Sequence, residues 1–172
     1  WLGDGLGALL WFLRFRGKVV DQNLALVSCW SLPRRRRLVR ELYRYMGRYA
    51  ADMVRLPGSM PPLAVEGESA LHEAGSSDAG TLVLFAHFGN WELLMPVLAE
   101  HLDGLTVIAK PMKNPLVNRW LASQRAECGF EVAPPGNAVR TALRVLRSGG
   151  AVAVAVDQWP GEMGSPCRFL GK

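Results

Sequence analysis

A short segment of the sequence brings together the residue types that perform general acid–base catalysis. It reads His87-Phe88-Gly89-Asn90-Trp91-Glu92, and it follows directly on an apolar run, Thr81 to Ala86, that is typical of a buried strand. An imidazole at the end of a strand can act as a base near neutral pH. Glu92 is expected in the first turn of the next helix, where the helix dipole favours a carboxylate and the side chain can reach back to one ring nitrogen of His87. The segment therefore predicts His87 as a general base and Glu92 as the group that orients it.

A second acidic group is predicted at the same edge of the sheet. Asp157 follows a continuous apolar run at residues 151–156. Ligands in open α/β sheets bind outside the carboxyl ends of the strands, so the imidazole and the carboxylates converge if the two strands are neighbours. The sequence contains neither a G-x-S-x-G nucleophile turn nor an H-E-x-x-H zinc motif. The base would then activate a substrate hydroxyl or a water, although a lone histidine at a strand end is often only structural.

From about Leu63, short apolar runs alternate with amphipathic segments, which is the pattern of an α/β fold with a mostly parallel sheet flanked by helices. Strands are predicted at 81–86, 105–109 and 151–156, and the first and last are expected at the sheet centre because they are apolar without alternation. Helices are predicted from Asn114, an N-cap followed by Pro115, to about Glu127, and from Asn137 to Arg147. The second helix is expected to direct Val139, Leu143 and Leu146 inward and Arg140, Arg144 and Arg147 outward.

The first 56 residues predict a separate basic, helical, membrane-proximal region that precedes an α/β core over residues 57–172. After Pro33, apolar residues at helical spacing predict one long helix. Its inward stripe consists of Leu38, Leu42, Tyr45, Met46, Tyr49 and Met53, and Arg40, Arg44 and Arg48 are expected on the opposite face. Upstream, the apolar run from Leu6 to Leu13 is shorter than the roughly 20 residues of a bilayer span. It is an interfacial helix, a truncated span or an ordinary buried amphipathic helix.

Composition restricts the class of protein without deciding its function. The chain has 172 residues, of which 49% are hydrophobic and 20% charged, as in a globular domain rather than a disordered or fibrous chain. The net charge of +5 is regional, because residues 14–55 hold 11 lysines and arginines against three acidic residues. Such a block can face nucleic acid, anionic lipid or solvent. The three cysteines form no C-x-x-C pair and indicate neither a disulfide framework nor a zinc ribbon. A first residue other than Met leads us to expect a fragment.

The segment from His87 to Glu92 resembles the H-x-x-x-x-[D/E] signature of the lysophospholipid acyltransferase superfamily. Its particular form, H-F-G-N-W-E, is similar to that of the lipid A late acyltransferases, which transfer lauroyl or myristoyl chains, and of the phosphatidylinositol mannoside acyltransferases. Two further blocks of that family resemble Asn114-Pro115-Leu116 with Arg125, and Val156-Asp157-Gln158 with Gly164-Ser165 and Phe169. The resemblance covers most of the chain. It departs from the family at Pro160, in an incomplete membrane anchor and in the absence of the family's C-terminal part.

The resemblance implies an O-acyltransferase that moves a fatty acyl chain from acyl carrier protein or coenzyme A to a hydroxyl of a membrane glycolipid such as a lipid A precursor. His87 would be the general base and Glu92 its orienting partner, while Arg125, Asp157 and Asn90 would bind substrate or stabilise the transition state. No metal or redox cofactor is implied, because the thioester already carries an activated acyl group. The enzyme would act at the cytoplasmic face of the bacterial inner membrane, with its basic helices against anionic lipid.

Two other interpretations stay open at this point. The arginine run Arg34–Arg37 fits a basic module that binds a membrane or nucleic acid without catalysis. No recognised nucleic-acid fold signature accompanies this run, and we therefore expect no nucleic-acid partner. Alternatively, His87 activates water in a lipid esterase or thioesterase. Release of free fatty acid without transfer would favour that second enzyme.

Overall fold

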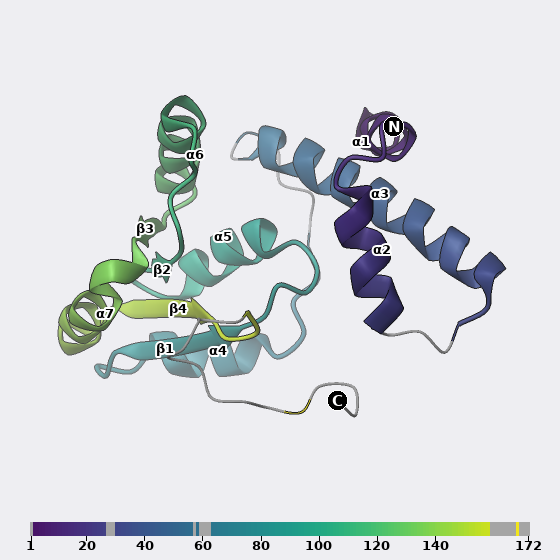
Figure 1. Ribbon diagram of the computed structural model, residues 1–172. Helices are drawn as coiled ribbons and strands as arrows, with labels where there is room; N and C mark the ends of the chain where they lie inside the picture. The colour runs from purple at the N-terminus through teal and green to yellow at the C-terminus, as the bar shows by residue number, and fades with distance from the viewer. Residues whose placement is uncertain (1, 27–29, 57, 59–62, 159–167, 169–172) are drawn as a thin grey trace. The chain divides into compact units, whose positions relative to one another are not determined.

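The computed structural model describes residues 2–26, 30–56, 58, 63–158 and 168, and it divides into two compact units. The helical unit includes the chain up to Val54, and the α/β unit begins at Arg55. Figure 1 labels the elements of both units. The α/β unit contains the segment from His87 to Glu92 and therefore carries the predicted chemistry.

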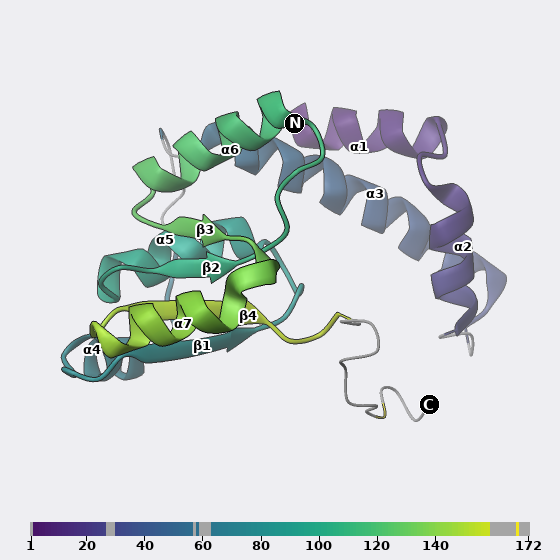
Figure 2. The ribbon, with the colours of Figure 1, turned by 60° about the vertical axis from the view of Figure 1, so that its left-hand side comes forward.

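A parallel sheet with helices on both sides forms the α/β unit. Among the described residues it has four strands in the order β1 (Thr81–Phe85), β4 (Ala151–Ala155), β2 (Thr106–Ile108) and β3 (Glu131–Ala133). The accompanying helices are α4 (Glu68–Gly75), α5 (Trp91–His101), α6 (Pro115–Glu127), the 3-10 helix η1 (Pro135–Asn137) and α7 (Ala138–Arg147). Figure 2 shows α7 in front of the sheet and α4 and α5 behind it. The predicted fold class, a helical N-terminal region followed by a mostly parallel sheet flanked by helices, is confirmed.

The core of this unit lies between α5 and one face of the sheet. Its buried side chains come from α5 and the residue after it, from β2 and the residue before it, from β4 and from the residue before β3: Met95, Leu98, Leu102, Leu105, Val107, Phe130, Ala151 and Ala153. Burial of each large apolar side chain contributes about 1.5–3 kcal/mol, so the cluster holds α5 firmly on the sheet. Because α5 begins just beyond His87 and carries Glu92, this packing positions the predicted site.

The two apolar strands differ in their place in the sheet. β4 lies inside it, as predicted, but β1 lies at the edge of the described sheet and pairs there with β4. Along β1 the side chains alternate between half-buried and exposed, and Leu82 and Leu84 are 54% and 62% exposed. The prediction that β1 is central was therefore wrong for the described residues. A continuous apolar run indicates two apolar faces, and it does not indicate that the strand has a neighbour on both sides.

The predicted limits of α6 and α7 agree with the structure. Asn114 caps α6, because its Oδ1 accepts hydrogen bonds from the backbone N–H of Leu116 and of Val117, and the helix ends at Glu127 as predicted. The prediction of which side chains of α7 point inward was partly wrong, since Val139 is 75% exposed and Leu143 is also exposed. The helix instead turns Val145 toward Gly150, beside β4. Its apolar face is wider than the part of the sheet that it covers.

Glycines determine the packing of the helical unit, which consists of α1 (Leu2–Phe12), α2 (Gly17–Leu26) and α3 (Leu32–Arg55). A Cβ atom on Gly3 or Gly7 would lie 2.6 Å from the Cα atom of Arg48 or Arg44, so the backbones of α1 and α3 are in direct contact. Asp4 of α1 pairs with Arg48 at 2.9 Å. The unit is therefore held by backbone contact and an ion pair at the crossing of α1 and α3.

This crossing uses a different face of α3 from the predicted one. Tyr43 and Gly47 are buried, whereas Leu42, Tyr45 and Met46 of the predicted inward stripe are exposed. Arg44 and Arg48, predicted to point away from the packing face, lie at the contact with α1. The spacing of apolar residues does not indicate a helix contact that is made by glycines, which have no side chain. This explains the error. In the part of the chain that the structure describes, no helix combines the length and the hydropathy that a membrane crossing requires.

Candidate active site

His87 and Asp157 meet at the carboxyl ends of two neighbouring parallel strands. β1 and β4 lie side by side with Phe85 opposite Ala155, so the residues that follow them reach the same edge of the sheet (Figure 1). Nδ1 of His87 lies 2.9 Å from Oδ1 of Asp157. The backbone N–H of His87 donates to Oδ2 of the same carboxylate, also over 2.9 Å. The predicted convergence of imidazole and carboxylate is thus confirmed for this pair.

The contact determines which ring nitrogen of His87 carries the proton. The hydrogen bond from the imidazole lowers the pKa of Asp157 below its ordinary value, so this carboxylate is ionised at neutral pH and can only accept. Nδ1 must therefore be the donor, and the neutral ring keeps its lone pair on Nε2. Both side chains are more than one third exposed, which leaves this edge of the sheet open to a substrate. Such a ring, held by a carboxylate, is equipped to act as a general base.

A tight turn places His87 between β1 and α5. The N–H of Phe88 donates to the carbonyl of Ala86 over 2.7 Å. Gly89 has a φ of +71°, a conformation that is strained for a residue with a side chain. Asn90 is the extended N-cap residue of α5, and its carbonyl accepts from the N–H groups of Leu93 and Leu94. The glycine in the motif thus allows the chain to reverse directly after the base.

Glu92 has Arg125 of α6 as its partner, which differs from the prediction that it contacts His87. Nη2 of Arg125 donates to Oε1 over 2.6 Å, and Nε donates to Oε2 over 3.2 Å. The two side chains are 4% and 12% exposed, so this is a buried, two-point ion pair. The orienting contact that was expected from Glu92 is made by Asp157. Glu92 points from the first turn of α5 toward α6, and the relative position of two helices is not encoded in a local motif.

Aromatic rings connect the two ion pairs. The ring centre of Phe85 lies 6.4 Å from that of His87 and 6.0 Å from that of Trp91. The guanidinium carbon of Arg125 lies 5.3 Å from the centre of the Trp91 ring, within the range of a cation–π contact. A continuous row of packed groups therefore runs from the base to the buried pair. Sequence reasoning did not single out Phe85 or Trp91, whose only signal was their place beside His87 and Glu92.

A cavity of about 440 Å³ lies next to Arg125 in the α/β unit. Its wall includes residues of α6, residues that follow β2, and residues within and on either side of β3, among them Ala109, Pro111, Asn118, Arg125, Phe130, Glu131 and Pro134. The apolar part of this wall suits hydrocarbon. The guanidinium of Arg125, which is paired with Glu92, and the carboxylate of Glu131 place opposite charges on the wall. Arg125 thus contacts Glu92 on one side and borders a ligand-sized cavity on another.

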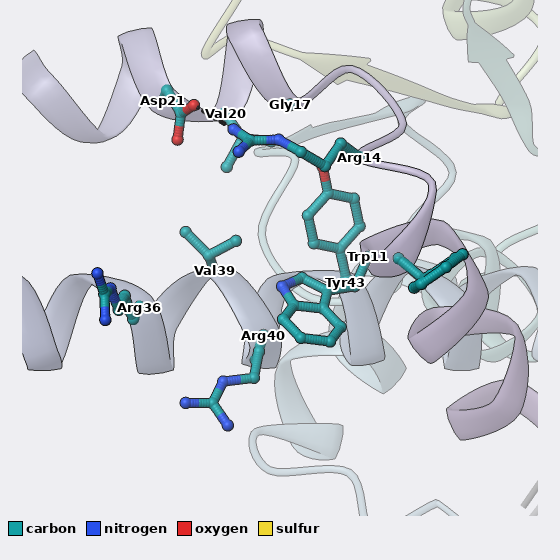
Figure 3. Close-up of a pocket in the computed structure, with 10 residues that line it drawn as sticks. Trp11, Arg14, Gly17, Val20, Asp21, Arg36, Val39, Arg40 and Tyr43 are labelled. Carbon is teal, nitrogen blue, oxygen red and sulfur yellow. Dashed lines mark hydrogen bonds and ion pairs between the residues drawn. The ribbon is translucent and has the colours of Figure 1, made fainter.

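A second cavity, of about 610 Å³, lies within the helical unit (Figure 3). Apolar side chains and three arginines line it, among them Trp11, Val20, Val39, Tyr43, Arg14, Arg36 and Arg40. Figure 3 shows Arg14 extending toward Asp21, with which it pairs at 2.7 Å. No acidic side chain among the described residues pairs with Arg36 or Arg40. The cavity therefore combines apolar walls with two unneutralised cations.

The structure joins four of the five predicted site residues in two pairs, His87 with Asp157 and Glu92 with Arg125. The fifth, Asn90, lies in the sequence between them as the N-cap residue of α5. The predictions that concern Pro160, Gly164, Ser165 and Phe169 lie outside the described residues.

The fold and the site define an α/β protein with a histidine–carboxylate pair at the ends of neighbouring parallel strands. The model of a family described as bacterial lipid A biosynthesis acyltransferases matches residues 1–172, which is the whole sequence. The chain therefore belongs to the bacterial lipid A biosynthesis acyltransferase family, and the resemblance identified in its sequence is confirmed. A comparison with curated proteins gave no match.

Proposed function

We propose that this protein is an O-acyltransferase that moves a fatty acyl chain from an acyl thioester to a hydroxyl of a lipid A-type glycolipid. Its family supports acyl transfer onto such an acceptor. The observation that carries the choice of base is the 2.9 Å contact between Nδ1 of His87 and Asp157 at the strand ends. Acyl carrier protein or coenzyme A is the proposed carrier of the donor acyl group.

In the proposed mechanism, Nε2 of His87 takes the proton of the acceptor hydroxyl as its oxygen attacks the thioester carbonyl. Asp157 stabilises the imidazolium that forms. The tetrahedral intermediate then collapses to the new ester and expels the thiolate, which receives the proton from Nε2. The thioester supplies the activation, so the reaction needs positioning and proton transfer from the protein and no redox or metal cofactor.

We assign Glu92 and Arg125 to positioning. Their buried pair fixes the start of α5, packs on Trp91 and thereby supports the turn that carries His87. Arg125 also borders the 440 Å³ cavity, and we propose that its guanidinium, while paired with Glu92, contacts a polar group of the acceptor or the donor there. Asn90, at the N-terminus of α5, is proposed to contact substrate.

The helical unit is proposed to face anionic lipid at the cytoplasmic side of the bacterial inner membrane. Its arginines include Arg36 and Arg40 beside the 610 Å³ cavity, and the end of α1 exposes Leu9 and Phe12. Cations next to exposed apolar side chains are typical of a surface that binds anionic membranes. Such a surface would bring the site to an acceptor embedded in lipid.

The test uses the full-length protein in membranes, a labelled acyl thioester and a lipid A precursor. We expect His87→Ala and Asp157→Asn to lower acyl transfer by about a hundredfold or more, which is the contribution of a general base. Asp103→Asn is the matched control, because this exposed carboxylate precedes β2 and thus lies at the opposite end of the sheet. It should transfer at the wild-type rate.

Other outcomes would replace the proposal. Near-normal transfer by a folded His87→Ala variant would make the histidine structural. Release of free fatty acid without a labelled glycolipid would indicate an esterase or thioesterase. Binding of lipid or nucleic acid without turnover would indicate a basic binding module.

The positioning role of Glu92 has its own test. Glu92→Gln should lower kcat per folded molecule while the KM values for donor and acceptor stay near those of the wild type. If Glu92 only stabilises the fold, the variant yields less folded protein, and the remaining folded molecules keep the wild-type kcat.

A further inference from the structure

Three side chains able to bind metal meet where α4 contacts the end of α5, away from the predicted site. They are Glu68 and His72 of α4 and His101, the last residue of α5. Glu92 and His101 lie at opposite ends of α5, whose 11 residues span about 16 Å. The proposed acyl transfer uses none of these three residues.

Their ligand atoms are spaced as one metal ion requires. Oε1 of Glu68 lies 3.5 Å from Nε2 of His101 and 3.9 Å from Nε2 of His72, and the three ligand atoms lie within 4.8 Å of one another. Zinc bonds to nitrogen and oxygen at about 2.0–2.2 Å, so tetrahedral ligands are roughly 3.3–3.6 Å apart. Small side-chain rotations would therefore bring all three atoms to bonding distance.

The second nitrogen of His101 already has the contact that histidine ligands make in metal sites. Nδ1 lies 2.9 Å from the carbonyl oxygen of Val97, which can only accept. In the neutral ring the proton is therefore on Nδ1, and the lone pair of Nε2 is directed toward Glu68. The side chain is only 10% exposed, so the ring is held in this orientation.

α4 supplies the other two ligands on one face. Glu68 and His72 are four residues apart and are therefore neighbours on the helix surface. Their side chains are 57% and 69% exposed, so water can complete the coordination of an ion. The rings of His72 and His101 are in edge-to-face contact with their centres 5.0 Å apart. The set is thus assembled across two helices before any ion binds.

We propose that Glu68, His72 and His101 bind a divalent transition-metal ion, with Zn²⁺ as the expected occupant, and that the ion ties α4 to the end of α5. Two imidazoles and one carboxylate suit Zn²⁺, Cu²⁺ or Ni²⁺, whereas Mg²⁺ and Ca²⁺ favour oxygen ligands alone. The ion would hold α4 against the last turn of α5. The first turn of the same helix carries Glu92 of the proposed active site. This site is separate from the acyl transfer chemistry and does not depend on the proposed function.

The test is Zn²⁺ binding to the full-length protein after treatment with a chelator, measured by competition with a fluorescent zinc indicator. A proton competes for Nε2, because the Val97 carbonyl and Glu68 raise the pKa of His101, and the titration is therefore run at about pH 8. We expect one ion per chain in the wild type. Glu68→Gln and His72→Ala should each weaken binding by at least about tenfold, since loss even of outer groups costs 10- to 100-fold.

Two control variants separate this site from other sources of binding. Glu73→Gln removes a neighbouring exposed carboxylate of α4 and should bind Zn²⁺ as the wild type does. His87→Ala removes the only other histidine of the chain and should also keep the ion. Co²⁺ in place of Zn²⁺ should give a spectrum without thiolate charge-transfer bands, which excludes the cysteines as ligands.

A second readout is the Tm, because an ion that binds only the folded state raises it. Zn²⁺ should raise the Tm of the wild type and of Glu73→Gln, and it should raise that of His72→Ala less. The proposal is overturned if the wild type takes up no stoichiometric Zn²⁺, in which case the cluster is only an ion pair between Glu68 and His101. Equal affinity of Glu68→Gln, His72→Ala and the wild type would overturn it as well.

Discussion

Asp157 holds His87 by two hydrogen bonds, and its lowered pKa gives this contact a pH signature. A carboxylate whose pKa is lower in the folded state stabilises the protein above its unfolded pKa of about 3.8. This stabilisation is lost as the pH falls through the lower pKa of the folded state. We therefore expect the free energy of unfolding of Asp157→Asn to lie furthest below that of the wild type near neutral pH. The gap should narrow below about pH 4 in urea unfolding curves.

The control for this pH effect is again Asp103→Asn, whose carboxylate has no bond to His87 in the structure. A gap between wild type and Asp157→Asn that grows toward acid pH would contradict the assignment. The same narrowing in Asp103→Asn would show that the effect belongs to carboxylates in general.

The buried pair of Glu92 and Arg125 predicts strong coupling between two substitutions. Removal of one partner leaves the other charge buried and unpaired, which typically costs about 3–5 kcal/mol of stability. We expect Glu92→Gln and Arg125→Met each to lower the free energy of unfolding by about that amount. The double variant should lose clearly less than the sum, because no unpaired charge remains. Additive losses in urea unfolding would show that the two side chains do not interact.

At the scale of elements, the crossing of α1 and α3 depends on glycines. Substitution of a glycine at the crossing can be compared with substitution of one outside it. A Cβ atom on Gly7 would lie 2.6 Å from the Cα atom of Arg44, whereas one on Gly5 would meet nothing within 4 Å. We expect Gly7→Ala to destabilise the helical unit by about 1–3 kcal/mol, because the helices must separate. Gly5→Ala should instead stabilise it by up to about 1 kcal/mol through helix propensity. Far-UV circular dichroism during urea unfolding measures both, and equal effects would contradict the close contact.

The elements that could be predicted are those with local chemical signals. Asn114 and Pro115 identify the start of α6, and the continuous apolar run at residues 151–156 identifies a strand at β4, although not its place in the sheet. Their pattern was sufficient because a cap and a fully apolar strand depend on residues next to each other in the chain. The short strand β3 and helix α4 were not singled out, since neither carries a comparable signal.

The partners within the site depend on tertiary structure, and this is why they were only partly predicted. The position of His87 and Asp157 follows from two strand ends, so it needed only that β1 and β4 be neighbours. The partner of Glu92 depends on how α6 packs against α5, and no local pattern places Arg125, 33 residues away, beside it. The proximity of Glu68 and His72 to His101 was not predicted for the same reason, because it depends on how α4 packs against α5.

At the scale of the whole molecule, each unit contributes a different property. The α/β unit holds both ion pairs of the site, and the chain up to Val54 in the helical unit holds ten of the 20 lysines and arginines. The turn between α1 and α2 also exposes Leu13 and Phe15 among arginines. An enzyme with a lipid acceptor needs a surface that binds the membrane as well as a catalytic centre. Under the proposed function, separate parts of the chain meet these two needs.

This division predicts that charge removal in the helical unit weakens membrane binding selectively. Each cation near an anionic surface contributes about 1 kcal/mol, so Arg36→Gln with Arg40→Gln should weaken binding to anionic vesicles by about 2 kcal/mol, or roughly 30-fold. The matched control is Arg140→Gln with Arg144→Gln, which removes the same charge from exposed positions of α7 in the α/β unit.

Cosedimentation with vesicles of phosphatidylglycerol and phosphatidylcholine, at fixed salt, measures the difference in binding between the two pairs of substitutions. The control pair should bind nearly as the wild type does, and vesicles of phosphatidylcholine alone should not distinguish the variants, because the effect is electrostatic. Equal losses in both pairs would mean that net charge, and not this surface of the helical unit, governs the association.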